Sequence, residues 1–204
     1  MKENKKIISF PHLDLDTLLN AYKNGIFPMA ESKFDDSIFW VKPELRGILP
    51  IGSFHTSKSL KRHIKKNQSV IKFNKNFESI LNGCSDRADT WINPTLSNTY
   101  KLLYKAGYAQ SIEVFESNKL VGGLFGVNIN GVFFGESMYS DSPNASKIAL
   151  KFLLERLDIC GYSLFDTQFI TDHLMSLGAI EITQNSYLGL LKKALEQEVK
   201  YAFY

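Results

Sequence analysis

The clearest periodic pattern in the chain lies between residues 143 and 161, "PNASKIALKFLLERLDICG". Its apolar positions recur three and four residues apart, as one face of a helix requires, and a glycine follows at the end. The pattern therefore predicts a long helix with one side against a core. The apolar positions are Ala145, Ile148, Ala149, Phe152, Leu153 and Leu157.

Short, strand-like apolar runs precede this helix between residues 110 and 139. They read "QSIEVFES", "KLVGGLFGVNIN" and "GVFFGESMY", and turn residues separate them at Asn118 and at Asn130-Gly131. Asn-Gly between apolar runs is a strong hairpin signal, so we predict a meander of strands. Beyond the long helix, we predict a strand over 162–168, a helix over 170–179 and a strand over 180–183.

The first half of the chain is mostly helical in pattern. A strand-like "IISF" precedes a helix that Asp14 or Asp16 can cap and Gly25 can end. Residues 26–50 mix apolar anchors with prolines and favour an irregular segment. Further helices are predicted over 55–67, capped by Thr56 or Ser57, and over 73–84 and 94–107.

These elements together predict an α/β (α+β) fold with a mixed sheet. We expect a small N-terminal domain over residues 1–45 and a larger domain over residues 46–204.

Composition narrows the class of protein without naming a function. The 204 residues are 44% hydrophobic and 22% charged, with a formal net charge of +3. That balance is globular, and the charge is too small to imply a nucleic-acid partner by itself. Two distant cysteines, Cys84 and Cys160, indicate a reducing compartment. Without a signal-peptide pattern or an apolar run of roughly 18 residues, we expect a soluble, cytoplasmic protein with no membrane partner.

One predicted helix carries a one-sided row of cations. Lysine and arginine side chains fall at i, i+3, i+4 and i+7 along "KSLKRHIKK", while Leu60 and Ile64 lie on another side. A stripe of this kind can bind nucleic-acid phosphates, although a solvated helix face has the same pattern. The stripe consists of Lys58, Lys61, Arg62 and Lys65.

Four further residues are candidates for chemistry or stacking. Glu136 interrupts an apolar strand in "VFFGESMY", where a carboxylate facing a pocket could bind a cationic group. Asp166 and Gln168 alternate along "LFDTQ" and should point to the same side of a sheet. Trp91, in "DTWINPTL", could stack on a nucleobase or lie buried in the core.

Several common catalytic motifs do not occur in the sequence. The chain has no Gly-rich phosphate loop, no H-E-x-x-H and no G-x-S-x-G. We therefore expect neither a metal site nor serine hydrolase chemistry.

Seven motifs occur in order along the chain. They are "AYKNGIFPM", "HTSKSLKR", "TWINPTL…Y", "GYAQSIEVFESNKLVGGLFGV", "FGESMYSDSPNASKIAL", "LFDTQ" and "DHLMSLGA". This ordered set resembles the leucyl/phenylalanyl-tRNA–protein transferases, bacterial enzymes of the N-degron pathway. The resemblance implies that leucine, phenylalanine or methionine is transferred from aminoacyl-tRNA to the N-terminal Lys or Arg of acceptor proteins. It also implies a domain like the GNAT acyltransferases, with no acetyl-CoA, no ATP and no other cofactor.

The same resemblance implies roles for individual residues. Glu136 would face the substrate ammonium groups, Gln168 would hydrogen-bond the attacking amine, and Asp166 would orient or polarise Gln168. Trp91 and Met29 would hold the 3′-terminal adenosine, and the cationic stripe would hold the acceptor stem. The positions that match the aminoacyl pocket are Leu124, Phe133, Met138, Leu153, Leu157 and Phe165.

The chain departs from the family pattern at the tRNA-end side. "GIFPM" stands where members have "GIFPW", "FWVKPELR" stands where they have "WWSPDPR", and the usual "GLLA-GGDL" segment has no counterpart. Two alternatives stay open. One is a GNAT-like acetyltransferase that uses acyl-CoA, because the late strand–helix order and "HLMSLGA" also resemble that superfamily. The other is a tRNA-binding protein without catalysis. Acetyl-CoA binding would favour the first, and tRNA binding without aminoacyl transfer would favour the second.

Overall fold

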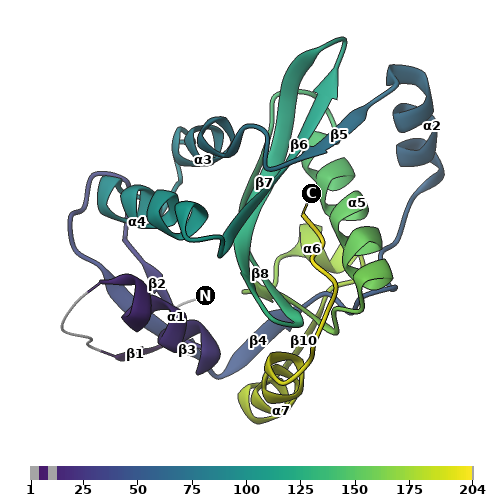
Figure 1. Cartoon of the computed structure of the whole chain (residues 1–204). Helices are drawn as coiled ribbons and strands as arrows, with labels where there is room; N and C mark the ends of the chain where they lie inside the picture. The colour runs from purple at the N-terminus through teal and green to yellow at the C-terminus, as the bar shows by residue number, and fades with distance from the viewer. Residues whose placement is uncertain (1–4, 9–12, 204) are drawn as a thin grey trace.

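A computed structural model describes residues 5–8 and 13–203, with side chains from residue 13 onward. In this part of the chain, helices cover both faces of a large sheet, and a small sheet lies beside it (Figure 1). The small sheet has the strand order β1-β3-β2, and the large sheet has the order β10-β4-β9-β8-β7-β6-β5. The helices are α1 (Leu15–Lys23), α2 (Lys58–Asn67), α3 (Phe77–Ser85), α4 (Pro94–Lys105), α5 (Ala145–Cys160), α6 (Asp172–Ser176) and α7 (Gln184–Leu195).

The strands of the large sheet pair antiparallel to their neighbours except for β8 and β9, which are parallel. The predicted mixed sheet with helices is thus confirmed. The strands are β1 (Lys5–Ile8), β2 (Phe27–Met29), β3 (Phe39–Pro43), β4 (Leu45–Ile48), β5 (Val70–Phe73), β6 (Ala109–Glu116), β7 (Lys119–Ile129), β8 (Val132–Ser140), β9 (Leu164–Gln168) and β10 (Ile180–Thr183).

Two hydrophobic clusters lie on opposite faces of the large sheet. The first cluster packs α1, α3, α4 and α7 against one face. The second packs α5 against the other, and it also contains Phe203 near the C-terminus. Side chains alternate between these faces along each strand, so neighbouring residues such as Phe133 and Phe134 enter different clusters. The site described below lies where strands of the large sheet contact both clusters.

The predicted long helix and the meander are confirmed. α5 ends at Gly161, whose φ of +85° is the left-handed conformation that glycine adopts without a Cβ clash. The turn residues Asn118 and Asn130 also have positive φ, as tight hairpins require. Asp14 is the cap of α1, and Ser57 is the cap of α2, each accepting a backbone N–H.

The prediction was wrong for several elements. Residues 26–50 are not irregular, because they contain β2, β3 and β4. These strands are short, so their local pattern is weak. β2 pairs with β3 nearby, whereas β4 pairs with β9 and β10 far along the chain. The helix predicted over 73–84 begins only at Phe77, after the unpredicted strand β5, and α6 has five residues. α7 was not predicted. β1 covers part of "IISF", whose last two residues lie outside the described residues.

Candidate active site

Glu136 occupies a β-bulge in the middle of β8. The register between β7 and β8 shifts where Phe125 pairs with Ser137 and Gly126 pairs with Gly135, so that Glu136 has no paired residue. Beyond the shift the faces exchange, since Met138 packs in the same cluster as Phe133 although it is five residues away. Bulges of this kind redirect single side chains next to active sites. Here the bulge directs a carboxylate out of an otherwise apolar strand.

The Glu136 carboxylate accepts three hydrogen bonds inside the protein. Tyr22 Oη donates to Oε1 at 2.7 Å, and Tyr100 Oη donates to Oε2 at 2.7 Å. Gln168 Nε2 donates to Oε1 at 3.1 Å. These donors come from α1, α4 and β9, so three distant parts of the chain converge on one side chain. We call Glu136, Tyr22, Tyr100 and Gln168 the carboxylate cluster.

Burial governs the protonation of this carboxyl group. Removal from water raises the pKa of Glu136 to about 7, against the opposing effect of hydrogen bonds from Tyr100, Tyr22 and Gln168. The nearby Asp166 charge also contributes to this raised pKa. A carboxyl group that titrates near neutral pH can accept or release a proton during a reaction. Glu136 is therefore suited to proton transfer as well as to binding a cation.

Asp166 is fully buried beside this cluster and forms an ion pair with Arg46. Arg46 donates to both of its carboxylate oxygens, from Nε at 2.9 Å and from Nη2 at 2.6 Å, and Tyr187 Oη donates to Oδ2 at 2.6 Å. The Arg46 guanidinium lies between the rings of Phe27 and Tyr187, 4.6 Å from each centroid. Such a fork-shaped pair fixes the orientation of both groups. Asp166 is thus placed to hold the local structure.

The backbone of Gln168 depends directly on Asp166. Gln168 has a φ of +63°, and its backbone N–H donates to Asp166 Oδ1 at 2.8 Å. A side-chain oxygen that accepts from the residue two positions on is the Asx arrangement, which stabilises such turns. Gly47 lies against this turn, and a Cβ there would be 2.6 Å from Thr167 Oγ1. The expected link between Asp166 and Gln168 therefore runs through the main chain.

An apolar pocket of about 100 Å³ opens beside Glu136. Leu124, Met138 and Phe165, three of the six residues expected to form an aminoacyl pocket, line it. Leu150, Leu174 and Thr167 also contribute to its wall. The other three expected residues do not line it, because Phe133, Leu153 and Leu157 are fully buried in the core cluster behind it.

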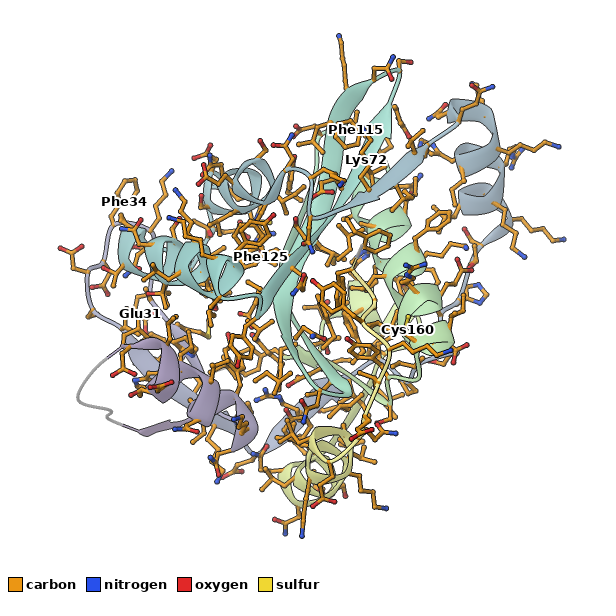
Figure 2. The ribbon with its side chains drawn as sticks, in the orientation of Figure 1. Glu31, Phe34, Lys72, Phe115, Phe125 and Cys160 are labelled. Carbon is orange, nitrogen blue, oxygen red and sulfur yellow. The ribbon has the colours of Figure 1, made fainter. Side chains whose placement is uncertain are left out.

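The residues expected to contact adenosine lie on the face of the large sheet that α1 and α4 cover. Trp91 is partly buried and meets Tyr100 edge to face, with ring centroids 6.3 Å apart. Met29 is also partly buried and ends β2. Both pack against the first hydrophobic cluster. Phe125, which Figure 2 labels, meets Tyr100 edge to face with ring centroids 5.1 Å apart, and it also lines the pocket.

The helix that carries the cationic stripe, α2, lies at the margin of the molecule (Figure 1). Lys58, Lys61, Arg62 and Lys65 are exposed, while Leu60 is buried and anchors the helix. No ion pair found within the described residues uses any of the four. Glu116 also contacts the helix, because its Oε1 lies 3.2 Å from Nε2 of His63 on α2. The same carboxylate accepts hydrogen bonds from Ser69 and Ser142.

Sequence reasoning missed four side chains of this site: Tyr22, Arg46, Tyr100 and Tyr187. Tyr22 and Tyr100 stand inside stretches that carry the family resemblance, "AYKNGIFPM" and "TWINPTL…Y", so a signal existed. Arg46 stands in the altered "FWVKPELR". Tyr187 belongs to the unpredicted helix α7, and nothing in its local pattern distinguishes it from a core residue.

Fold and site together define a class of protein. A pocket with apolar walls and a few converging polar groups is the usual form of a binding or catalytic site. A buried acid with a displaced pKa beside that pocket is typical of an enzyme. The chain is therefore an α/β protein with an enzyme-like site.

Comparison with known proteins gives the family. The family model described as leucyl/phenylalanyl-tRNA protein transferase matches residues 48–192, and the model of its N-terminal domain matches residues 12–44. The chain belongs to this family of transferases. A curated relative from Ruegeria sp. (strain TM1040) is 49% identical over 91% of this chain and 88% of its own length. One from Cereibacter sphaeroides (strain ATCC 17025) is 49% identical over 94% and 90%. Both are named leucyl/phenylalanyl-tRNA–protein transferase.

Solved structures give weaker likenesses. The structure of L-PGS from Bacillus licheniformis aligns with 79% of this chain and 55% of that one, at 11% identity and a TM-score of 0.43. A GCN5-related N-acetyltransferase-like protein from Streptococcus suis aligns at 10% identity, with a TM-score of 0.31, over 92% of this chain and 64% of its own. Among the described residues, no helix has the length and apolar character that a membrane crossing needs.

Proposed function

We propose that this chain transfers leucine, phenylalanine or methionine from aminoacyl-tRNA to the N-terminal Lys or Arg of acceptor proteins in the cytoplasm. The new peptide bond would mark these proteins for the N-degron pathway. Family membership carries the proposal, and the carboxylate cluster beside an apolar pocket supports it. In this reading the pocket holds the aminoacyl side chain and Glu136 faces the cationic groups of the substrates.

The reaction forms a C–N bond between the acceptor α-amine and the ester carbonyl, and it breaks the C–O bond to the terminal ribose. The amine must lose protons, and the ribose oxygen must gain one. Glu136, with its pKa near 7, is the group in the pocket that can accept a proton from the amine. Placing the amine against the ester supplies much of the acceleration, since positioning is worth roughly 7–11 kcal/mol.

Gln168 orients the attacking amine in this mechanism. Because its Nε2 donates to Glu136, its amide oxygen is left to accept an N–H of the amine. Asp166 and Arg46 keep the Gln168 backbone in place without touching the substrate. Trp91 and Met29 would hold the terminal adenosine, and the stripe on α2 would hold the acceptor stem of the tRNA.

The test is transfer of radiolabelled leucine from Leu-tRNA to a peptide that begins with Arg, with an Ala peptide as control. Label should reach the Arg peptide alone and be lost in Glu136→Ala and Gln168→Ala. Glu181→Ala, an exposed carboxylate on β10, is the matched control and should transfer normally. Binding of tRNA without transfer by the wild type would contradict the proposal and favour a non-catalytic tRNA-binding protein. Binding of acetyl-CoA would favour an acetyltransferase.

A further inference from the structure

The pocket beside Glu136 is small for an aromatic side chain. Its volume is about 100 Å³. An apolar protein cavity that binds benzene has a volume of about 150 Å³, and benzene has the size of the phenylalanine ring. A leucine side chain has four carbons and needs less space. The size of the pocket therefore favours an aliphatic aminoacyl group over an aromatic one.

Phe165 limits the depth of this pocket. Its ring lines the cavity and reaches toward the strand that carries Glu136, so that a Cβ on Gly135 would lie 3.1 Å from Phe165 Cζ. Phe133 stacks on the same ring from behind, with centroids 5.6 Å apart and planes 9° apart. The ring cannot withdraw unless Phe133 also moves, because both side chains are buried in a close-packed core.

Phe203, near the C-terminus, adds a third ring to this stack. Its ring packs on Phe133 with centroids 5.6 Å apart, and 3% of its surface is exposed. The segment that carries it is held by hydrogen bonds from Arg156 Nε to Ala202 O at 3.0 Å and from Asn74 Nδ2 to Phe203 O at 3.2 Å. Phe165, Phe133 and Phe203 thus form one aromatic row from the pocket to the C-terminal segment.

We propose that Phe165 is a specificity-determining residue that makes this chain select leucine over phenylalanine, and that Phe203 is a positioning residue that holds Phe165 through Phe133. The inference rests on the proposed function, which it narrows to aliphatic donors. In this arrangement the C-terminal segment sets donor choice without touching the donor.

The experiment uses two adenosine probes that carry leucine or phenylalanine through a stable 3′-amide, so that the nucleic-acid part is constant. Calorimetry gives the affinity of each probe for the wild type and its variants, and transfer from Leu-tRNA and Phe-tRNA is measured in parallel. One misplaced methylene in an apolar pocket changes selectivity by about 10–200-fold. We expect the wild type to prefer the leucine probe by at least ~10-fold, Phe165→Leu to remove most of that preference, and Phe203→Leu to reduce it ~3-fold.

Leu103→Ala is the matched control, because it opens a cavity in the other hydrophobic cluster. It should lower the melting temperature without changing the ratio of the two affinities. Equal binding of both probes by the wild type, or an unchanged ratio in folded Phe165→Leu, would overturn the inference. An unchanged ratio in Phe203→Leu would remove the positioning role. If the protein binds the two probes with different affinities but transfers an amino acid from neither tRNA, the proposed function is refuted, while the selectivity of the pocket is established.

Discussion

The side chains on the two faces of β9 make different kinds of interaction. Asp166 and Gln168 enter a hydrogen-bonded network in which Arg46, Glu136 and three tyrosines meet. Phe165, which directly precedes Asp166, packs in the aromatic row on the opposite face. Burial is similar on both faces, yet one face depends on exact pairing of polar groups and the other on shape. The polar face therefore suits chemistry, and the apolar face suits recognition.

The largest effect that separates the two faces should come from Asp166→Ala. Removing one partner leaves the Arg46 charge buried and uncompensated, so we expect the free energy of unfolding to fall by about 3–5 kcal/mol. Urea denaturation monitored by circular dichroism measures it. The double variant Asp166→Leu with Arg46→Met should recover much of this loss but not aminoacyl transfer, because the backbone N–H of Gln168 loses its acceptor, the Asp166 carboxylate. A double variant with full transfer would show that the pair has no positioning role.

A second difference between the faces should appear in pH dependence. The pKa of Glu136 is about 7 in the folded protein, above its ordinary value of 4.5, because the charged form is buried. The folded state therefore binds this proton more tightly, and the resulting stabilisation is complete below pH 4.5 and lost as the pH rises to about 7. The shift corresponds to about 3 kcal/mol.

Glu136→Gln should remove this contribution. The difference in unfolding free energy between wild type and Glu136→Gln should change by about 2–3 kcal/mol from pH 5 to pH 8, with the wild type relatively more stable at pH 5. Denaturant titrations at both pH values measure it. Phe133→Leu, on the apolar face, should lower the free energy of unfolding equally at both pH values. If the difference in unfolding free energy between wild type and Glu136→Gln does not change with pH, Glu136 is not the group that titrates in this range.

A smaller effect within the polar face concerns the tyrosine donors. The hydroxyl of Tyr100 lowers the pKa of Glu136, so Tyr100→Phe should raise that pKa above its present value of about 7. Hydrogen bonds to a charged group are worth about 1.5–3 kcal/mol, which sets the upper range of the shift at about one to two pKa units. Carboxyl carbon NMR titration of Glu136 would detect it. A lowered pKa in Tyr100→Phe would contradict the assigned donor.

The smallest effect lies outside both faces, on α2. Lys61→Ala should weaken tRNA binding and lower the slope of log affinity against log salt by about 0.7–0.9, as expected for one lost phosphate contact. Filter binding across a salt series measures the slope. Lys193→Ala, an exposed lysine on α7, serves as control and should leave the slope unchanged. If Lys61→Ala and Lys193→Ala have equal slopes, the cationic stripe does not contact the tRNA phosphates.

The sequence predicts one part of this molecule well and another part poorly. α5 and the meander are recognisable because their signals are local: apolar spacing, Asn-Gly and a terminal glycine. Glu136 also stands out, as a charge inside an apolar run. Its partner Tyr22 is 114 residues away, and Arg46 is 120 residues from Asp166. Such pairings depend on the tertiary fold, so no local pattern indicates them. The family resemblance predicts roles for Asp166 and Gln168, whereas the Asx hydrogen bond between them is a feature of the folded chain that no motif indicates.

The bulge at Glu136 has a consequence for how this stretch can change in evolution. One unpaired residue shifts the alternation of β8, so that Glu136 reaches the tyrosines while Met138 still reaches the pocket. Substitutions around it alter single side chains. The insertion or deletion of one residue between Gly126 and Met138 would instead exchange the faces of the following residues. The length of this segment should therefore stay constant across homologues even at positions where the residue type varies, and an alignment gap there would signal a different site.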